Sequence, residues 1–278
     1  MSADTYQEPV SKLLTYGDYL ELSQDSEPNY IERFGLTEQD IPELIRMATD
    51  AELNELDSDL SEVWAPLHAW HALGQLRAEA AIEPLIGLFG SGDEYVYEEM
   101  PEIFGKIGGA AIPALGTYLA DDSQDVWALI TAADCLREIA SNHPDHRAAA
   151  IAALVNQLES YANNDPNLNS TLINNLVLLK AVEAAPLIEQ AFTTDEIDEF
   201  LTGSWAQIQV DLGLKQKEDF SPEELKPKVP PQLAAFHQNM EKLAKAFDIQ
   251  TQQHQKPKGF GVVPPIDIQK PKKKKKKK

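Results

Sequence analysis

The sequence predicts an all-α fold, an α-solenoid of stacked helix pairs, and two observations support that prediction. Residues 64–122 give nearly the same pattern twice, at a period of about thirty residues. The first copy consists of WAPLHAWHALGQL followed by AAIEPLIGLFGSGD. The second consists of YVYEEMPEIFGKI followed by AAIPALGTYLADD. Each copy has apolar residues at helical spacing, so each is expected to form one long and one shorter amphipathic helix. A fixed period of this size is typical of a repeat array, in which each unit buries its apolar face against the next.

Residues 1–62 are predicted to form a helical cap before the first clear repeat. In residues 9–24 the apolar residues recur at mixed spacings of three and four, which predicts a helix with Gly17 as its weak point. Thr37 stands before a run of polar and acidic residues, a capping signal that predicts a second helix over about residues 38–49.

Two further helix pairs and a closing helix are predicted to complete a repeat domain over residues 63–214. The third pair is expected around residues 132–158 and the fourth around residues 168–192. Residues 196–214 are expected to seal the last apolar face, as a helix that Gly203 can divide in two. The pairs expected to be buried between repeats recur at intervals of 31, 32 and 40 residues: Leu73 and Leu76, Phe104 and Ile107, Leu136 and Ile139, Leu176 and Leu179.

Residues 215–278 differ from the rest in composition and are predicted to be a flexible Pro/Lys-rich region. Large apolar residues become few, while proline, glutamine and lysine are frequent. One helix is expected within this region over residues 232–247, where five apolar residues have helical spacing. The chain ends in PKKKKKKK, a run whose mutual repulsion opposes folding.

The net charge of -21 combines two parts of opposite sign. Residues 1–214 contain 8 Lys and Arg against 38 Asp and Glu, whereas residues 215–278 contain 16 against 7. The body is therefore at -30 and the C-terminal region at +9. An acidic body repels nucleic acid phosphates and anionic lipid, so nucleic acid is not its expected partner. The lysine tail is expected to bind acidic partners, and the nearest acidic surface is that of the body itself.

The cysteine content and the N-terminal sequence predict a cytoplasmic protein. Cys135 is the single cysteine, which excludes an intramolecular disulfide and any site built from several cysteines. The first ten residues, MSADTYQEPV, have neither the basic nor the apolar region of a secretion signal. No window approaches ~18 uninterrupted apolar residues, so no membrane span is predicted.

The repeat pattern resembles the HEAT repeat, and more narrowly the bacterial short HEAT-like repeats of the phycobilisome-lyase type. The resemblance covers about residues 64–192 and is best in residues 93–115, through Asp93, Val96, Phe104, Gly105, Ile107, Gly108, Ile112 and Leu115. The family's Arg column is absent, since its places hold Pro66, Tyr97, Leu129 and Asn169. The resemblance implies an architecture and only weakly a function, because repeat motifs of this kind specify folding.

A candidate partner-binding site lies in the sequence DEYVYEEMPE, in the middle of the array. Acidic residues surround two tyrosines, a combination suited to a basic or amphipathic partner segment, because tyrosine offers a large contact area at low entropy cost. At least one of the two tyrosines is expected to be exposed, since residues two apart cannot share a helix face. The alternative is a solvated helix N-terminus, where the helix dipole favours carboxylates. The candidate residues are Glu94, Tyr95, Tyr97, Glu98, Glu99 and Glu102.

Other residue combinations point less clearly to chemistry. His68 and His71 have a spacing that a metal pair can use, but Trp64 and Trp70 flank them, so packed or half-exposed histidines are the expectation. Cys135 lies within an amphipathic stretch with no helix N-terminus to activate it as a nucleophile. Neither a catalytic motif nor a phosphate-binding loop is present, and no metal or cofactor is expected.

The sequence thus predicts a non-catalytic protein-binding scaffold or assembly factor with an acidic surface. Its expected partner is a protein with a basic or amphipathic segment, which includes the protein's own C-terminal tail. One alternative is a chromophore lyase or a lyase-partner subunit, which only the repeat resemblance implies. Another is a nucleic-acid-associated protein that acts through its lysine tail.

Overall fold

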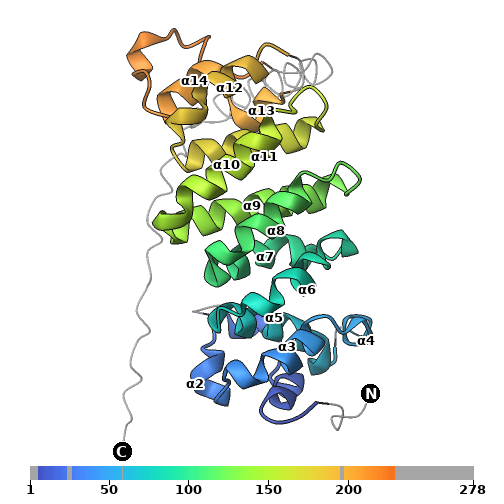
Figure 1. Cartoon of the computed structure of the whole chain (residues 1–278). Coiled ribbons are helices and arrows are strands. Elements are labelled where there is room, and N and C mark those ends of the chain that lie inside the picture. Colours follow the sequence, from blue (N-terminus) through green and yellow to red (C-terminus); the bar gives the residue numbers. More distant parts are fainter. Residues whose placement is uncertain (1–5, 24–26, 58, 195–196, 229–278) are drawn as a thin grey trace, which may run out of the picture. The chain divides into compact units, whose positions relative to one another are not determined.

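The computed structural model describes residues 6–23, 27–57, 59–194 and 197–228 (Figure 1). Within these residues all regular structure is helical and none is a strand, so the all-α prediction is confirmed. Residues 1–228 form one compact unit. The helix expected over residues 232–247, and most of the flexible region to which it was assigned, lie outside the described residues.

The α-helices differ greatly in length, and the longest lie in the middle of the chain (Figure 1). Short 3-10 turns join many of them. In order the α-helices are α1 (Tyr19–Leu22), α2 (Tyr30–Phe34), α3 (Ile41–Ala48), α4 (Ala51–Asn54), α5 (Ala65–Gln75), α6 (Ile82–Ile86), α7 (Glu94–Ile107), α8 (Ile112–Leu119), α9 (Val126–Asn142), α10 (Arg147–Leu158), α11 (Pro166–Leu178), α12 (Ala185–Ala191), α13 (Glu199–Thr202) and α14 (Trp205–Asp211).

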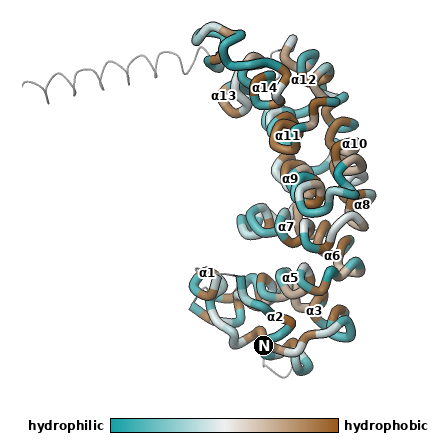
Figure 2. The backbone as a smooth tube through the Cα atoms, turned by 90° about the vertical axis from the view of Figure 1, so that its left-hand side faces the viewer, coloured by the Kyte–Doolittle hydropathy of each residue, from teal (hydrophilic) through white to brown (hydrophobic). Residues whose placement is uncertain are grey.

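Successive long helices pack side by side. α5 packs on α7, α7 on α9, and α9 on α11. The shorter helices α6, α8 and α10 also pack in succession, and Figure 2 shows them along one edge with α7, α9 and α11 beside them. The first helix of each predicted pair therefore contacts the first helix of the next. No helix among the described residues has the length and apolar character needed to cross a membrane.

An aspartate begins each of the long helices α7, α9 and α11. Asp93 accepts a hydrogen bond from the backbone N–H of Tyr95, and Asp125 and Asp165 make the same bond two residues ahead, at 2.8–2.9 Å. An acceptor at this position satisfies one of the backbone donors that a helix N-terminus leaves free. These aspartates mark where α7, α9 and α11 begin, whereas α5 has no such side-chain cap.

Glycines allow the long helices to approach one another closely. A Cβ atom on Gly105 of α7 would lie 2.8 Å from Nδ2 of Asn142 and 3.1 Å from Cβ of Glu138, both on α9. A Cβ atom on Gly74 of α5 would lie 3.5 Å from the backbone of Ile103 on α7. The Leu-Gly and Phe-Gly pairs of the sequence thus lie where neighbouring long helices pack against each other.

The core includes all but one of the apolar residues that the repeat alignment identified. Leu73, Phe104, Leu136, Ile139 and Leu176 have no exposed surface, and Ile107 and Leu179 are buried. Leu76 differs, because α5 ends at Gln75 and leaves its side chain half-buried.

Two predicted helices are divided at glycines. The first, expected over residues 9–24, is wrong as a single helix: a 3-10 turn over Val10–Thr15 is followed by Gly17, whose φ is +110°, and then by α1. The closing helix is divided at Gly203, whose φ is +80°, into α13 and α14. Backbone with these φ values suits glycine and stops a right-handed helix. The helix expected over residues 38–49 is confirmed as a 3-10 turn followed by α3.

Candidate functional site

The candidate residues of α7 fall into two groups. Glu94, Glu98 and Glu102 are exposed, whereas Tyr95, Tyr97 and Glu99 are half-buried. The expectation that one tyrosine would be exposed is therefore wrong, because both side chains are half-buried. The three exposed glutamates form an acidic stripe along one side of α7, and the three half-buried residues contact other parts of the protein.

Tyr95 packs against Trp64, which immediately precedes α5. The two ring centroids are 5.6 Å apart and the rings are nearly perpendicular, at 70°. Together with Trp70 and Asp93, these rings line a pocket of about 280 Å³, which we call the aromatic pocket. Its remaining walls come from Asn54, Val63 and Leu67.

Several carboxylates lie near enough to Tyr95 to act on its phenol electrostatically. Burial raises the pKa of this phenol, and the negative charges of nearby carboxylates raise it further; in decreasing order of effect these are Asp18, Glu98, Asp93 and Glu94. Three of the four belong to the start of α7, and the fourth comes from the residue that caps α1. A cation near Tyr95 would therefore meet a strongly negative potential.

Glu99 points away from the exposed stripe, toward the buried His71 of α5. His71 Nδ1 lies 2.8 Å from Glu27 Oε1, and His71 Nε2 lies 3.0 Å from Glu99 Oε2. The second contact is close enough for an ion pair, but its direction leaves Nε2 without a hydrogen bond among the described residues. The ring of Tyr19 stacks on His71 at 4.6 Å. Glu99 is therefore part of the interior rather than of a free acidic surface.

Lys106 of α7 adds a cation to this network of charged side chains. Its ammonium group lies 2.6 Å from Glu27 Oε1 and 2.7 Å from Glu102 Oε1. Burial raises the pKa of Glu27, but hydrogen bonds from His71 and Lys106 outweigh that effect and lower the pKa to about 2. The result is an alternating series of negative and positive groups that joins the residues before α2 to α5 and α7.

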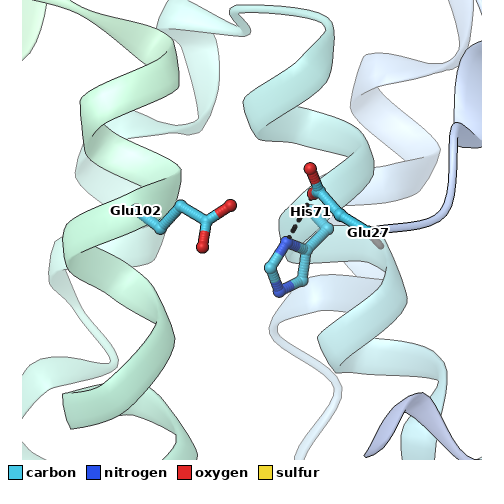
Figure 3. A group of neighbouring side chains, drawn as sticks. All are labelled: Glu27, His71 and Glu102. Carbon is cyan, nitrogen blue, oxygen red and sulfur yellow. Dashed lines mark hydrogen bonds and ion pairs between the residues drawn. The ribbon is translucent and has the colours of Figure 1, made fainter. Parts of the chain in front are cut away.

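Three residues of this network also have side chains of the kind that coordinate metal ions. Figure 3 shows Glu27 and His71 in contact, with Glu102 directed toward them from α7. One ligand atom from each of the three lies within 4.8 Å of the others. Lys106 already pairs with both carboxylates, however, so a metal ion would have to displace a cation that the fold itself supplies. The arrangement fits an ion-pair network better than a metal site.

His68, one turn before His71, is held by neutral partners. Its Nδ1 lies 2.8 Å from the hydroxyl of Tyr30, and its Nε2 lies 2.9 Å from the backbone carbonyl oxygen of Gly17. Burial lowers the pKa of His68 to about 4, despite the bond to Gly17, which raises it. Both histidines are buried, one of the two placements that the sequence left open, and both bind the N-terminal cap. That role was not predicted, because their partners lie 38 to 51 residues away in the sequence.

Cys135 has no exposed surface and lies inside α9. Burial raises the pKa of its thiol well above the usual value, which opposes formation of a nucleophilic thiolate. His143, at the end of the same helix, directs Nε2 to the backbone carbonyl of Gly105 at 2.8 Å. These surroundings are those of a core residue.

Comparison with known proteins finds no match to a family model, to a curated protein or to a solved structure. Any functional conclusion therefore depends on the site itself, and the resemblance to HEAT repeats depends on the sequence pattern alone.

Proposed function

We propose that this protein is a non-catalytic protein-binding scaffold or assembly factor, which binds a basic segment of a partner protein at the start of α7. The helix pairs would form a HEAT-like solenoid, and the exposed residues Glu94, Glu98 and Glu102 would supply part of its acidic surface. The succession of packed long helices supports this architecture. Such arrays typically present extended surfaces to partners.

The observation that carries the proposal is that most of the few basic residues of the body form ion pairs within the chain. Five of the 8 Lys and Arg residues in residues 1–214 pair with carboxylates of the same chain. Among the described residues, Glu94 and Glu98 have no such partner. These two exposed carboxylates therefore contribute negative charge at the start of α7, where Tyr95 and Tyr97 are half-buried. The paired residues are Lys12 with Glu8, Arg46 with Glu43, Lys106 with Glu27 and Glu102, Arg137 with Glu138, and Arg147 with Glu183.

A peptide-binding experiment on the full chain tests this function. The ligand is a Lys-rich amphipathic peptide, and its dissociation constant is measured by calorimetry at low and at high salt. We expect salt-sensitive binding that the double variant Glu94→Lys, Glu98→Lys weakens by about tenfold, since reversing charges at a binding surface removes attraction and adds repulsion.

The control carries the same change in net charge at a distance from α7. Glu159→Lys with Glu189→Lys alters two exposed carboxylates in the later repeats. Equal weakening by both double variants would mean that the peptide senses only diffuse charge. Absence of binding to the unaltered chain at low salt would refute the proposed function.

A further inference from the structure

We propose that the aromatic pocket binds an alkylammonium group, namely the side chain of a lysine or an N-methylated lysine in the partner segment. This inference rests on the proposed function and specifies which group of the basic segment is recognised. The residues that would make the site are Trp64, Trp70, Tyr95 and Asp93.

The aromatic walls have a fixed geometry. Trp64 and Tyr95 meet at 70°, so they enclose a corner rather than a flat slot. Trp70 is 1% exposed and donates its indole N–H to the backbone carbonyl of Ala48 at 2.7 Å, which holds its ring in place. A compact cation that enters the corner can contact more than one ring, and a cation within ~6 Å of a ring centroid is attracted by the π-system.

The charge around the pocket selects a cation over an apolar group. Asp93 lines the pocket, and Asp18, Glu94 and Glu98 are close enough to act electrostatically on the Tyr95 hydroxyl. An apolar side chain would fit the walls but would gain nothing from these four carboxylates. The methylene groups of a lysine could lie along Val63 and Leu67, as long charged side chains do on apolar surface.

The size of the pocket favours a single side chain. Its volume of about 280 Å³ is at the lower limit of small-molecule sites, which span ~300–1,000 Å³. A guanidinium group is planar and stacks on flat ring faces, whereas an ammonium group is compact and suits a corner. Lysine is therefore the expected residue.

The first test uses three peptides that differ only at one central position. This position holds lysine, trimethyllysine or the uncharged norleucine, and each peptide is titrated into the full chain. Both cationic peptides should bind about tenfold more tightly than the norleucine peptide. Equal or tighter binding of the norleucine peptide would overturn the proposal and indicate a pocket for apolar side chains.

A matched pair of variants tests the role of Asp93. Asp93→Asn removes the charge but keeps an oxygen that can accept the Tyr95 N–H bond, because asparagine caps helices as well as aspartate does. Asp125→Asn makes the same change at the start of α9, where Asp125 accepts the N–H of Trp127 at 2.9 Å. Only Asp93→Asn should reduce the preference for lysine. An equal effect of the two variants would contradict a direct role for this carboxylate.

A small probe separates failure of the pocket from failure of the proposed function. N-acetyl-trimethyllysine methylamide should shift the indole N–H signal of Trp64 in NMR spectra of the full chain, with the signal assigned through Trp64→Phe. If the amphipathic peptide binds but the probe produces no shift, the pocket proposal fails and the acidic surface stands. If the probe shifts the signal and no basic peptide binds, the scaffold proposal fails and the pocket stands.

Discussion

His68 and His71 lie one turn apart on α5 with no exposed surface, yet their surroundings favour opposite protonation states. His68 contacts a tyrosine hydroxyl and a backbone carbonyl, whereas His71 lies between the carboxylates of Glu27 and Glu99. Burial lowers the pKa of His71, but the contacts to those two carboxylates outweigh this effect and raise it above its usual value of 6.5. One helix thus holds a neutral histidine and a histidine that favours the charged form.

These opposite shifts predict that stability is highest near pH 6.5. The raised pKa of His71 gives stability that is complete below pH 6.5 and is lost as the pH rises through the folded-state pKa. The pKa of His68, lowered to about 4, gives the opposite slope, with stability lost as the pH falls from 6.5 toward 4. Glu27, with a pKa lowered from 4.5 to about 2, adds a further loss of stability as the pH falls from 4.5 toward 2. Melting temperatures measured across this pH range test the prediction.

Single substitutions should remove one side of this pH profile at a time. His71→Gln should abolish the decrease above pH 6.5 that depends on His71, and His68→Gln should reduce the decrease between pH 6.5 and 4. His146→Gln is the control, because His146 is exposed and should leave the profile unchanged. A profile that keeps both slopes in His71→Gln would contradict the assignment.

Replacing Phe104 by alanine should destabilise the repeats strongly. The ring has no exposed surface and packs edge-on against Phe89, with centroids 5.7 Å apart. The lost burial and the resulting cavity should lower the free energy of unfolding by about 3–5 kcal/mol, measured by urea denaturation. Trp127→Ala serves as the control: at 54% exposure it should change stability by no more than ~0.5 kcal/mol. Similar losses in both variants would argue against the described core.

Two glycine-to-alanine substitutions should change stability in opposite directions. In Gly105→Ala the new methyl group would lie 2.8 Å from Nδ2 of Asn142, whose flexible amide must turn away. It would also lie 3.1 Å from Cβ of Glu138, so α7 and α9 must shift by a few tenths of an ångström, at a cost of about 1–3 kcal/mol. In Gly116→Ala, within α8, the nearest atom is Cβ of Ala153 at 3.5 Å, an ordinary contact. There alanine should add about 0.5–1 kcal/mol through helix propensity. Thermal unfolding of both variants tests whether the packing of α7 against α9 requires glycine at position 105. Equal melting temperatures of the two variants would contradict that requirement.

Glu98 and Glu99 should respond very differently to replacement by lysine. Glu98 is exposed, so Glu98→Lys should change stability by no more than ~0.5 kcal/mol. The side chain of Glu99 is 17% exposed and lies beside His71, so Glu99→Lys would bury a cation against a histidine and should cost at least about 2 kcal/mol. Urea denaturation of the two single variants compares them. Equal stability would mean that Glu99 belongs to the surface, as the sequence alone suggested.

The sequence by itself determined the helical class and the burial of the aligned apolar residues. An apolar residue at every third or fourth position is a local pattern, because the geometry of a helix brings such residues to one face whatever lies beyond it. Phe104, Leu136 and Leu176 were predicted to be buried for this reason, and they are. The division of the closing helix at Gly203 was likewise readable, since glycine at positive φ is a local property.

Only the tertiary structure decided which charged and aromatic residues are available to a partner. Adjacent glutamates on α7 look equivalent in the sequence, yet Glu98 is exposed and Glu99 lies beside His71. Tyr95 was predicted within an acidic cluster, but Trp64, which forms the facing wall, is 31 residues away in the sequence. Charge counts and periodicity do not predict these contacts. A contact between residues far apart in the sequence depends on how the helices pack and not on any local spacing.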